Sequence, residues 1–292
     1  MADPLDALRA PVTPADPDPA FAARLRARLE RALGLPEGVA VTETTLTPAE
    51  PAGAAPLKQG DISYASLWVR DVARAAAFYG AVLGLEYVSA HDNRGRQALG
   101  LAPPQGLWQH PALSTLFCSY VVGDIAAAVA RVRAAGGQAE EPAPRAYGLS
   151  ADCVDTDGVR FALYQPPAGA PATAGPPASP GGHDGDLVYV TLEVPDAART
   201  LGFYCSVLGW RVRPGRTPGG WQVEGTTPMI GISGGHSAPA AVPVWQVTDL
   251  AAAVAQVREA GGTSTEPHRE PYGLMAECAD DQDIRFSLGQ FP

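Results

Sequence analysis

The pattern of apolar and polar positions in residues 61–85 predicts a strand followed by a helix. Residues 63–69 form a short stretch of β-prone, partly apolar side chains, as a half-buried strand does. Asp71 then stands where a helix N-cap is expected, and Gly84 stands where a C-cap glycine is expected. Between them, apolar side chains recur at helical spacing: Val72, Ala75, Phe78, Tyr79, Val82 and Leu83.

The same pattern returns in residues 187–210. Asp71 corresponds to Asp196 and Gly84 to Gly209, each at an offset of 125 (196 − 71 and 209 − 84). The offset persists through the following residues: Asp124 with Asp249, Tyr147 with Tyr272, Cys153 with Cys278, Arg160 with Arg285, and Gln165 with Gln290. The chain therefore contains two copies of one unit, and this repeat determines its architecture.

Each copy contains the strand–helix pattern twice. In the first copy, three short strands are predicted after the first helix, at residues 86–89, 97–101 and 107–110. A strand at 115–122 and a helix at 125–135 then repeat the opening pattern, and Gly136-Gly137 ends the helix. Three further strands are predicted at residues 138–141, 149–154 and 159–164. Each repeat is therefore expected to consist of two βαβββ units.

We predict four segments: an N-terminal helix and linker at 1–60, the first repeat at 61–166, a Pro/Gly/Ala-rich linker at 167–184, and the second repeat at 185–292. The N-terminal helix is amphipathic, because apolar side chains recur every four residues at Phe21, Leu25, Leu29 and Leu33. Two interpretations stay open. The apolar stripe packs on its own domain, or it docks onto a protein partner.

Composition narrows the range of partners. The chain has 292 residues, 46% of them hydrophobic, and a formal net charge of −10. The acidic balance argues against nucleic acid or an anionic membrane as the main partner. Neither a signal peptide nor a membrane-spanning stretch is predicted, so we expect a cytoplasmic protein. The four cysteines lack CxxC spacing, which favours reduced thiols over a disulfide framework.

Together these motifs resemble the vicinal oxygen chelate superfamily, which includes glyoxalase I, extradiol dioxygenases and bleomycin resistance proteins. The resemblance rests on a strand ending at a capping aspartate, then FYxxVLG, AAVxxVRxAGG and DxxGxRFxL. It implies an α+β fold in which each pair of βαβββ units curls into a cup-shaped sheet. In the family, metal ligands project from the concave face, and several unrelated chemistries use the same scaffold.

The metal-ligand positions of the family can be located in each repeat. The first ligand is usually a histidine seven residues before the capping aspartate, and the last is a glutamate near the end of the repeat. The corresponding positions hold Tyr64, Phe117 and Ala162 in the first repeat, and Tyr189, Val242 and Ser287 in the second. None of these is His, Glu, Asp or Cys, so we predict neither a metal nor another cofactor. The five histidines are expected in loops or at strand edges, exposed to solvent: His91, His110, His183, His236 and His268.

Strand alternation predicts which residues share a face with these positions. We call the two sets the first cup and the second cup. The first cup comprises Tyr64, Ser66, Trp68, Phe117, Ser119, Arg160, Ala162 and Tyr164. The second cup comprises Tyr189, Thr191, Glu193, Val242, Gln246, Arg285 and Ser287. Asp152 and Glu277 are expected to pair with Arg160 and Arg285.

This lining suits a flat, largely apolar ligand with one anionic or carbonyl group, so the favoured function is metal-independent binding of a small molecule. A second interpretation is a metal-free isomerase, lyase or cyclase. Its acid–base candidates are Tyr64, Tyr189, Arg160, Asp152 and Glu277. A third is a regulatory or structural protein that docks through residues 21–33. The aromatic side chains could equally fill collapsed cups as core. We expect either a monomer with an internal pseudo-dimer or a homodimer.

Overall fold

The computed structural model describes residues 57–90, 93–169 and 182–292. Both repeats belong to one compact unit of the chain. The helix predicted over residues 21–33 lies outside the described residues, as does most of the predicted linker at 167–184. Among the described residues, no helix is both long enough and apolar enough to cross a membrane.

The first repeat contains the two βαβββ units that its sequence predicts, with one additional short strand, β7, in the second unit. The first unit consists of β1 (Ile62–Val69), α2 (Val72–Leu83), β2 (Tyr87–Ala90), β3 (Gly95–Ala98) and β4 (Gln105–Gln109). The second consists of β5 (Thr115–Val121), α3 (Ile125–Ala134), β6 (Gln138–Ala139), β7 (Ala143–Arg145), β8 (Gly148–Val154) and β9 (Arg160–Gln165). The side chain of Asp71 accepts hydrogen bonds from the backbone N–H groups of Ala73 and Arg74, both at 3.0 Å, and so caps α2 as predicted. Gly84 adopts the left-handed conformation that ends the helix, with φ 67°.

The second repeat has the same order of elements. Its first unit consists of β10 (Leu187–Glu193), α4 (Ala197–Leu208), β11 (Val212–Pro214), β12 (Gly220–Val223) and β13 (Met229–Ser233). Its second unit consists of β14 (Ala240–Gln246), α5 (Leu250–Glu259), β15 (Thr263–Ser264), β16 (His268–Glu270), β17 (Gly273–Ala279) and β18 (Arg285–Gln290). The short strands β7 and β16, which form hairpins with β8 and β17, were not predicted.

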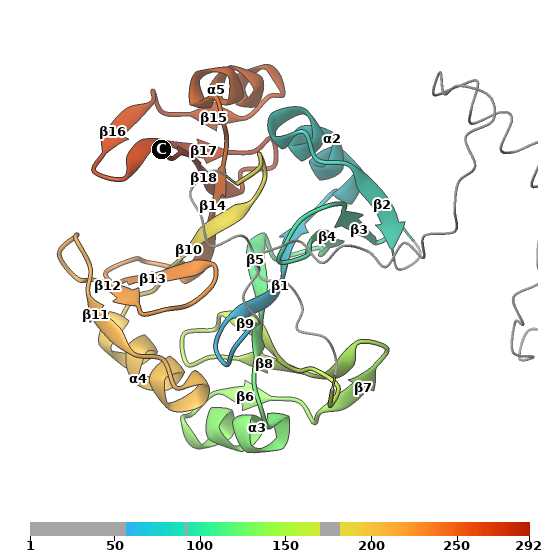
Figure 1. The fold of residues 1–292 in the computed structure, drawn as a ribbon, viewed down its shortest axis with the longest axis vertical. Coiled ribbons are helices and arrows are strands. Elements are labelled where there is room, and N and C mark those ends of the chain that lie inside the picture. The colour runs from blue at the N-terminus through green and yellow to red at the C-terminus, as the bar shows by residue number, and fades with distance from the viewer. Residues whose placement is uncertain (1–56, 91–92, 170–181) are drawn as a thin grey trace, which may run out of the picture. The chain divides into compact units, whose positions relative to one another are not determined.

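Each repeat forms its own mixed sheet (Figure 1). The strand order is β2-β3-β4-β1-β5-β9-β8-β6 in the first repeat and β11-β12-β13-β10-β14-β18-β17-β15 in the second. The two units of a repeat meet where β1 pairs with β5, and β10 with β14, both antiparallel. These sheets confirm the predicted α+β architecture of two tandem repeats.

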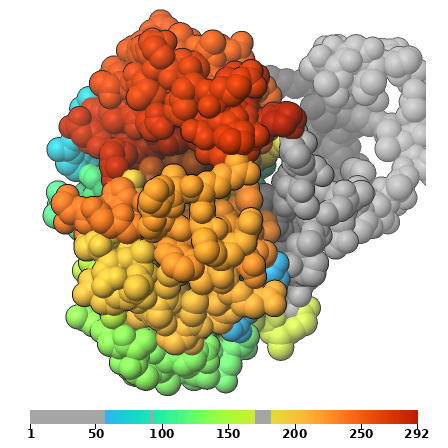
Figure 2. All heavy atoms as spheres, turned by 90° about the vertical axis from the view of Figure 1, so that its left-hand side faces the viewer, coloured from blue at the N-terminus to red at the C-terminus, as the bar shows by residue number. Residues whose placement is uncertain are grey.

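The two repeats pack against each other reciprocally. Helix α2 of the first repeat contacts α5 of the second, and α4 of the second contacts α3 of the first (Figure 1). In Figure 2, the green segment that contains α3 adjoins the yellow and orange segment of the second repeat. The equivalent strands β5 and β14 also contact each other. The first helix of each repeat thus contacts the second helix of the other repeat. Two copies related by a two-fold axis make such reciprocal contacts.

Glycines allow the helix contacts to be close. A Cβ atom added at Gly137 would lie 2.7 Å from Cε2 of Phe203, and one added at Gly262 would lie 3.0 Å from Cε2 of Phe78. Phe78 and Phe203 are equivalent residues of α2 and α4, and both are buried. The Gly-Gly pairs that end the second helix of each repeat therefore also let an aromatic ring of the other repeat approach the backbone.

A buried tyrosine joins the repeats on each side. The hydroxyl group of Tyr79 donates to Asp280 Oδ2 at 3.0 Å, and that of Tyr204 donates to Asp155 Oδ2 at 3.0 Å. Each aspartate also accepts two backbone N–H groups of its own turn, which for Asp280 are those of Gln282 and Ile284, both at 2.8 Å. Both carboxyl groups are therefore hydrogen-bonded despite their burial.

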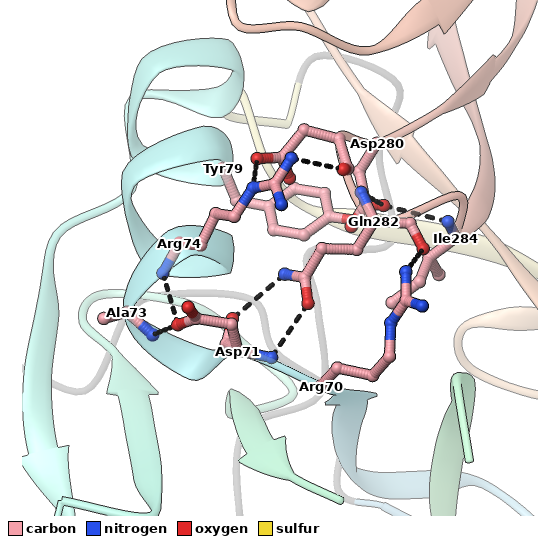
Figure 3. A network of polar contacts seen from close by, with 9 residues as sticks. Arg70, Asp71, Ala73, Arg74, Tyr79, Asp280, Gln282 and Ile284 are labelled. Carbon is pink, nitrogen blue, oxygen red and sulfur yellow. Dashed lines mark hydrogen bonds and ion pairs between the residues drawn. The ribbon is translucent and has the colours of Figure 1, made fainter. Parts of the chain in front are cut away.

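Figure 3 shows the contact between α2 and the turn that follows β17. Gln282 binds the backbone of Asp71 twice: its Oε1 accepts from the N–H group at 2.8 Å, and its Nε2 donates to the carbonyl group at 2.9 Å. Arg70 donates to the carbonyl oxygen of Gln282 at 2.9 Å, and Arg74 pairs with Asp281. The N-terminus of α2 is thus held by the other repeat.

The turn aspartates predict a dependence of stability on pH. Burial raises the pKa of the Asp280 carboxyl group above its ordinary value of 3.8, although backbone hydrogen bonds partly lower it. A raised folded-state pKa means that the stability contributed by this group is present at low pH and is lost as pH rises through the raised value. Asp280→Asn cannot ionise and keeps an acceptor oxygen. The free energy of unfolding of Asp280→Asn minus that of the parent should therefore increase from pH 3.5 to pH 7.

Urea unfolding at several pH values measures this difference. Asp155→Asn serves as the matched variant, because burial also raises the pKa of Asp155. A difference between parent and variant that does not change with pH would contradict the prediction.

Candidate functional site

The predicted residues of the first cup lie on one face of the first sheet. Tyr64 is opposite Ser119, and Ser66 is opposite Phe117, in the pairing of β1 with β5. Ser119 pairs in turn with Ala162 on β9. The alternate residues of these strands belong to the buried core. Strand register therefore places Tyr64, Ser66, Phe117, Ser119 and Ala162 on one face of the sheet.

Three aromatic rings form a stack in the first cup. The ring centroid of Trp68 lies 4.9 Å from that of Phe117, with 11° between the planes, and 5.0 Å from that of His110, with 7° between the planes. All three side chains are partly buried. His110 was predicted to be solvent-exposed. Instead it packs on Trp68, and its Nδ1 accepts the backbone N–H of Leu113 at 2.9 Å.

A tyrosine lies over a glycine in each cup. A Cβ atom added at Gly106 would lie 2.3 Å from the hydroxyl oxygen of Tyr64, and one added at Gly231 would lie 2.0 Å from that of Tyr189. Any larger residue would displace the phenol ring. Gly106 and Gly231 obey the 125-residue offset (231 − 106), as do the two tyrosines. The tyrosines thus occupy the same place in both repeats.

A glutamine fixes the phenol of the second cup. The hydroxyl group of Tyr189 donates to Gln222 Oε1 at 3.2 Å, while Gln222 Nε2 donates to the carbonyl oxygen of Ile230 at 2.9 Å. The equivalent residue of the first repeat, Gln97, donates likewise to the carbonyl oxygen of Gln105 at 2.7 Å. Sequence reasoning missed these glutamines and the two glycines. Their exact repetition at the same offset was the signal that could have found them.

Burial raises the pKa of Tyr64 and of Tyr189 above the ordinary value of 10.0. A hydrogen bond with Ser66 partly opposes this effect at Tyr64. Both phenols therefore stay protonated near neutral pH, and neither is suited to abstract a proton. Tyr64 is suited to form a hydrogen bond with a ligand, whereas the hydroxyl group of Tyr189 already donates to Gln222.

The side chain of Arg160 forms no hydrogen bond or ion pair with another described residue. Its charge lowers the pKa of Asp152, but burial of Asp152 outweighs this effect, and the net direction is upward. The expected ion pair between Arg160 and Asp152 is absent from the described contacts. Arg160 is exposed, and the next residue of β9, Phe161, pairs with Cys118, the residue that follows Phe117 on β5.

The second cup is also assembled on one face, but its lining is more polar. Thr191 lies opposite Val242, and Ser287 pairs with Val244. Gln246 is buried, and its Nε2 donates to the carbonyl oxygen of Gly182 at 2.8 Å, so this amide is occupied within the protein. Where the first repeat has an aromatic stack built on Trp68, the second repeat has Glu193 (68 + 125).

Arg285 pairs with Glu193 and not with Glu277. Its Nη1 donates to Glu193 Oε1 at 3.2 Å, and its Nη2 donates to Oε2. Glu277 instead accepts the hydroxyl group of Thr265 at 2.9 Å and lies 3.6 Å from His268. The predicted pairing of Glu277 with Arg285 is wrong, because Glu193 supplies a carboxylate on the same face of the sheet.

The four cysteines are free, as the sequence suggests. Burial raises the pKa of Cys118, Cys153 and Cys278 to about 12 in each case. These thiols are therefore protonated at neutral pH and are poor nucleophiles.

A large cavity in the described part of the chain lies outside both cups. It is a groove of about 480 Å³ between α3 and α4, lined among others by Arg131, Arg199 and Phe203. A smaller cavity, about 10 Å³, lies in the core under α2. Neither is lined by a residue predicted to bind ligand.

Comparison with known proteins agrees with this architecture. Residues 61–163 match the Glyoxalase/Bleomycin resistance protein/Dioxygenase superfamily, and residues 189–288 match the Glyoxalase-like domain. The chain belongs to this superfamily. Both repeats are thus glyoxalase-like domains, as the resemblance implied. No curated protein matches the chain.

Solved structures show the same fold at low sequence identity. The Mn(II)-bound glyoxalase from Novosphingobium aromaticivorans gives a TM-score of 0.62 at 17% identity, over 80% of this chain and 82% of that protein. The 2,3-dioxygenase LapB from Pseudomonas sp. KL28 gives 0.58 at 17% identity, over 82% and 95%. The 2,2',3-trihydroxybiphenyl 1,2-dioxygenase from Sphingomonas wittichii strain RW1 gives 0.59 at 15% identity, over 80% and 91%.

The residues of this glyoxalase-like chain do not fit a chelated metal. The ligand positions hold phenol, hydroxyl and hydrocarbon side chains: Tyr64, Phe117, Ala162, Tyr189, Val242 and Ser287. A divalent metal needs several imidazole, thiolate or carboxylate donors that converge. Within the described ranges, no group of three or more His, Cys, Asp or Glu side chains is arranged in that way.

Proposed function

We propose that the first cup binds a planar aromatic molecule with an anionic group, and that it does so without a metal. The observation that carries this proposal is the juxtaposition of an aromatic stack with an unpaired cation. Trp68 and Phe117 are stacked and partly exposed, and the exposed Arg160 precedes Phe161, which pairs on the adjacent strand with Cys118, the residue after Phe117. Aromatic ligands stack on such rings, and a guanidinium group binds carboxylates in two-pronged geometry.

Three further groups support the recognition of a polar substituent. Tyr64 is protonated at neutral pH, because burial raises the pKa of its hydroxyl group. Ser66 and Ser119 lie on the same face and are buried, so their hydroxyl groups sit at the floor of the cup. A ligand that lies flat against Phe117 would meet a cation at its side and hydroxyl groups beneath it.

The second cup does not offer the same chemistry. Glu193 neutralises Arg285 and replaces the tryptophan of the first repeat, while Val242 replaces Phe117. An aromatic anion therefore loses both the stacking surface and the free cation there. The repeat supplies a built-in control, because each first-cup residue has a counterpart 125 residues later.

A titration with 2-naphthoate tests the proposal. Phe117→Ala should weaken binding by about 3–10-fold, since an aromatic ring contact contributes about 0.5–1.5 kcal/mol. Val242→Ala, the matched change in the second cup, should leave the affinity unchanged. Isothermal titration calorimetry measures both variants, with cyclohexanecarboxylate as the non-aromatic ligand and EDTA present throughout.

Three outcomes would refute the proposal. These are equal affinity for the aromatic and non-aromatic carboxylates, loss of binding in EDTA, and equal effects of Phe117→Ala and Val242→Ala. Equal affinities for the two carboxylates would show that stacking plays no role. Loss of binding in EDTA would show that a metal is needed. Equal effects of the two variants would show that the ligand is not specific to the first cup.

A further inference from the structure

A serine, a histidine and a glutamate form a connected chain beside the second cup. Ser233 Oγ lies 2.9 Å from His236 Nε2, and His236 Nδ1 lies 3.4 Å from Glu193 Oε2. The two nitrogens of one imidazole thus face a hydroxyl group and a carboxylate. A histidine so placed can accept a proton from the serine, and the carboxylate, at an ion-pair distance, can stabilise the imidazolium that forms.

The carboxylate of this chain is held in place. Glu193 ends β10, and its side chain is 14% exposed. Arg285 donates to both of its oxygens, which leaves Oε2 shared between the guanidinium group and His236. The side chain of His236 is 33% exposed, so the imidazole is within reach of a small molecule. His236 was predicted to be a solvent-exposed surface residue, and the structure instead places it against Glu193 and Ser233.

Backbone donors lie next to the serine. Ser233 ends β13 and is followed by Gly234-Gly235. The N–H group of Gly234 reaches the carbonyl oxygen of Gly219 only at 3.4 Å, a long bond that leaves this donor weakly occupied. A Cβ atom added at Gly234 would lie 3.3 Å from the backbone nitrogen of Ala197, the first residue of α4. The first turn of α4 therefore borders the residue that follows the serine. Its N-cap, Asp196, accepts the N–H groups of Ala198 and Arg199 at 3.0 and 3.1 Å, so the donor of this turn that faces Gly234 is the N–H group of Ala197.

We propose that Ser233 is a nucleophile for acyl transfer and that its substrates are small carboxylic esters. Ser233 Oγ attacks the ester carbonyl carbon, and His236 Nε2 takes the hydroxyl proton. Negative charge that develops on the carbonyl oxygen is stabilised by the Gly234 N–H group and the N-terminus of α4. The C–O bond to the alcohol breaks, and His236 returns the proton to the leaving alkoxide.

Water completes the reaction. It attacks the acyl-serine ester while His236 takes its proton, and the acid and free Ser233 are released. Glu193 does not change its protonation state; it stabilises the imidazolium that forms in each step. The inference is independent of the aromatic site in the first cup, because no residue is shared between the two sites.

The first repeat lacks this chemistry. At the same offset, Ser233 corresponds to Trp108, His236 to Pro111, and Glu193 to Trp68. The proposal therefore predicts a reactive serine on the second repeat that has no counterpart on the first, although the two repeats have the same fold.

The test uses the full chain with a fluorophosphonate probe and with p-nitrophenyl acetate. The probe should add one covalent group, with release of fluoride, and peptide mass spectrometry should locate it on Ser233. Ser233→Ala should abolish labelling and reduce ester hydrolysis to the rate of an inactive protein. His236→Gln should reduce both rates at least 100-fold, the usual effect of removing a general base. Ser237→Ala, a neighbouring serine outside the chain of contacts, should react like the parent.

Binding of 2-naphthoate and circular dichroism establish that the variants fold. Labelling of another residue, absence of labelling, or hydrolysis by Ser233→Ala at the parental rate would overturn the proposal. Each of these results would show that Ser233 and His236 merely close the end of β13. If naphthoate fails to bind the parent but Ser233 is labelled, the first-cup proposal fails alone.

Discussion

Replacing Tyr204 with alanine is expected to lower the free energy of unfolding by about 3–5 kcal/mol, as for other buried aromatic residues. Tyr204 is fully buried, and its ring stacks on Trp210 at a centroid distance of 4.9 Å. It also contacts Phe161 of the other repeat at 5.7 Å. The truncation would leave a cavity at the junction of the repeats and would remove a hydrogen-bond donor from Asp155. Equilibrium unfolding in urea measures the change.

Two variants separate packing from hydrogen bonding. Tyr204→Phe keeps the ring and loses the bond to Asp155, so it should cost about 1–2 kcal/mol. Tyr79→Ala is the matched truncation on the other side of the junction and should cost about as much as Tyr204→Ala, because Tyr79 is equally buried and bonds to Asp280. Equal losses for Tyr204→Ala and Tyr204→Phe would contradict the role assigned to the ring.

Much of the fold could be predicted from sequence because local signals and the repeat agree. Asp71 and Gly84 bracket α2 by capping chemistry that needs no tertiary contact. The exact 125-residue offset then transfers each element of one repeat to the other. The hairpins of β7 and β16 were missed because their pairing with β8 and β17 depends on backbone contacts, and their residues carry no strand pattern.

For the candidate site, strand alternation predicted which residues share a face of the sheet, but not which side chains contact one another. Alternation along β1 and β5 placed Tyr64, Ser66 and Phe117 on one face, and the register agrees. Strand alternation does not determine which charged side chains form ion pairs, because that depends on side-chain and loop conformation. Arg285 therefore pairs with Glu193 and not with the predicted partner, Glu277. Loop geometry also brought His236 to Ser233, which no spacing rule predicts.

The same scaffold thus carries two different linings. Equivalent positions keep the tyrosine–glycine pair in both repeats, whereas the positions of Trp68 and Phe117 hold an acid and an aliphatic residue in the second. The pairing of β1 with β5 and of β10 with β14 depends on the buried alternate residues, so residues on the cup face are free to differ. This freedom is why the fold alone does not determine function.

Arg160→Ala is expected to weaken the binding of 2-naphthoate by about 1.5–3 kcal/mol, or roughly 10–150-fold in Kd. No hydrogen bond or ion pair joins the Arg160 side chain to another described residue, so a ligand carboxylate gains a charge-assisted hydrogen bond without breaking an existing one. Tyr64→Phe removes a neutral hydroxyl group and should cost about 1 kcal/mol. Isothermal titration calorimetry of the two variants measures both effects.

Arg285→Ala is the matched control, because Arg285 holds the equivalent position and is already paired with Glu193. It should leave the affinity for 2-naphthoate unchanged. If Arg285→Ala weakens binding as much as Arg160→Ala does, the ligand lies in the second cup. If Arg160→Ala and Tyr64→Phe both bind like the parent but melt at a lower temperature, the two residues contribute only to packing. If Tyr64→Phe keeps affinity but turns over a substrate about 100-fold more slowly, the first cup is a catalytic site.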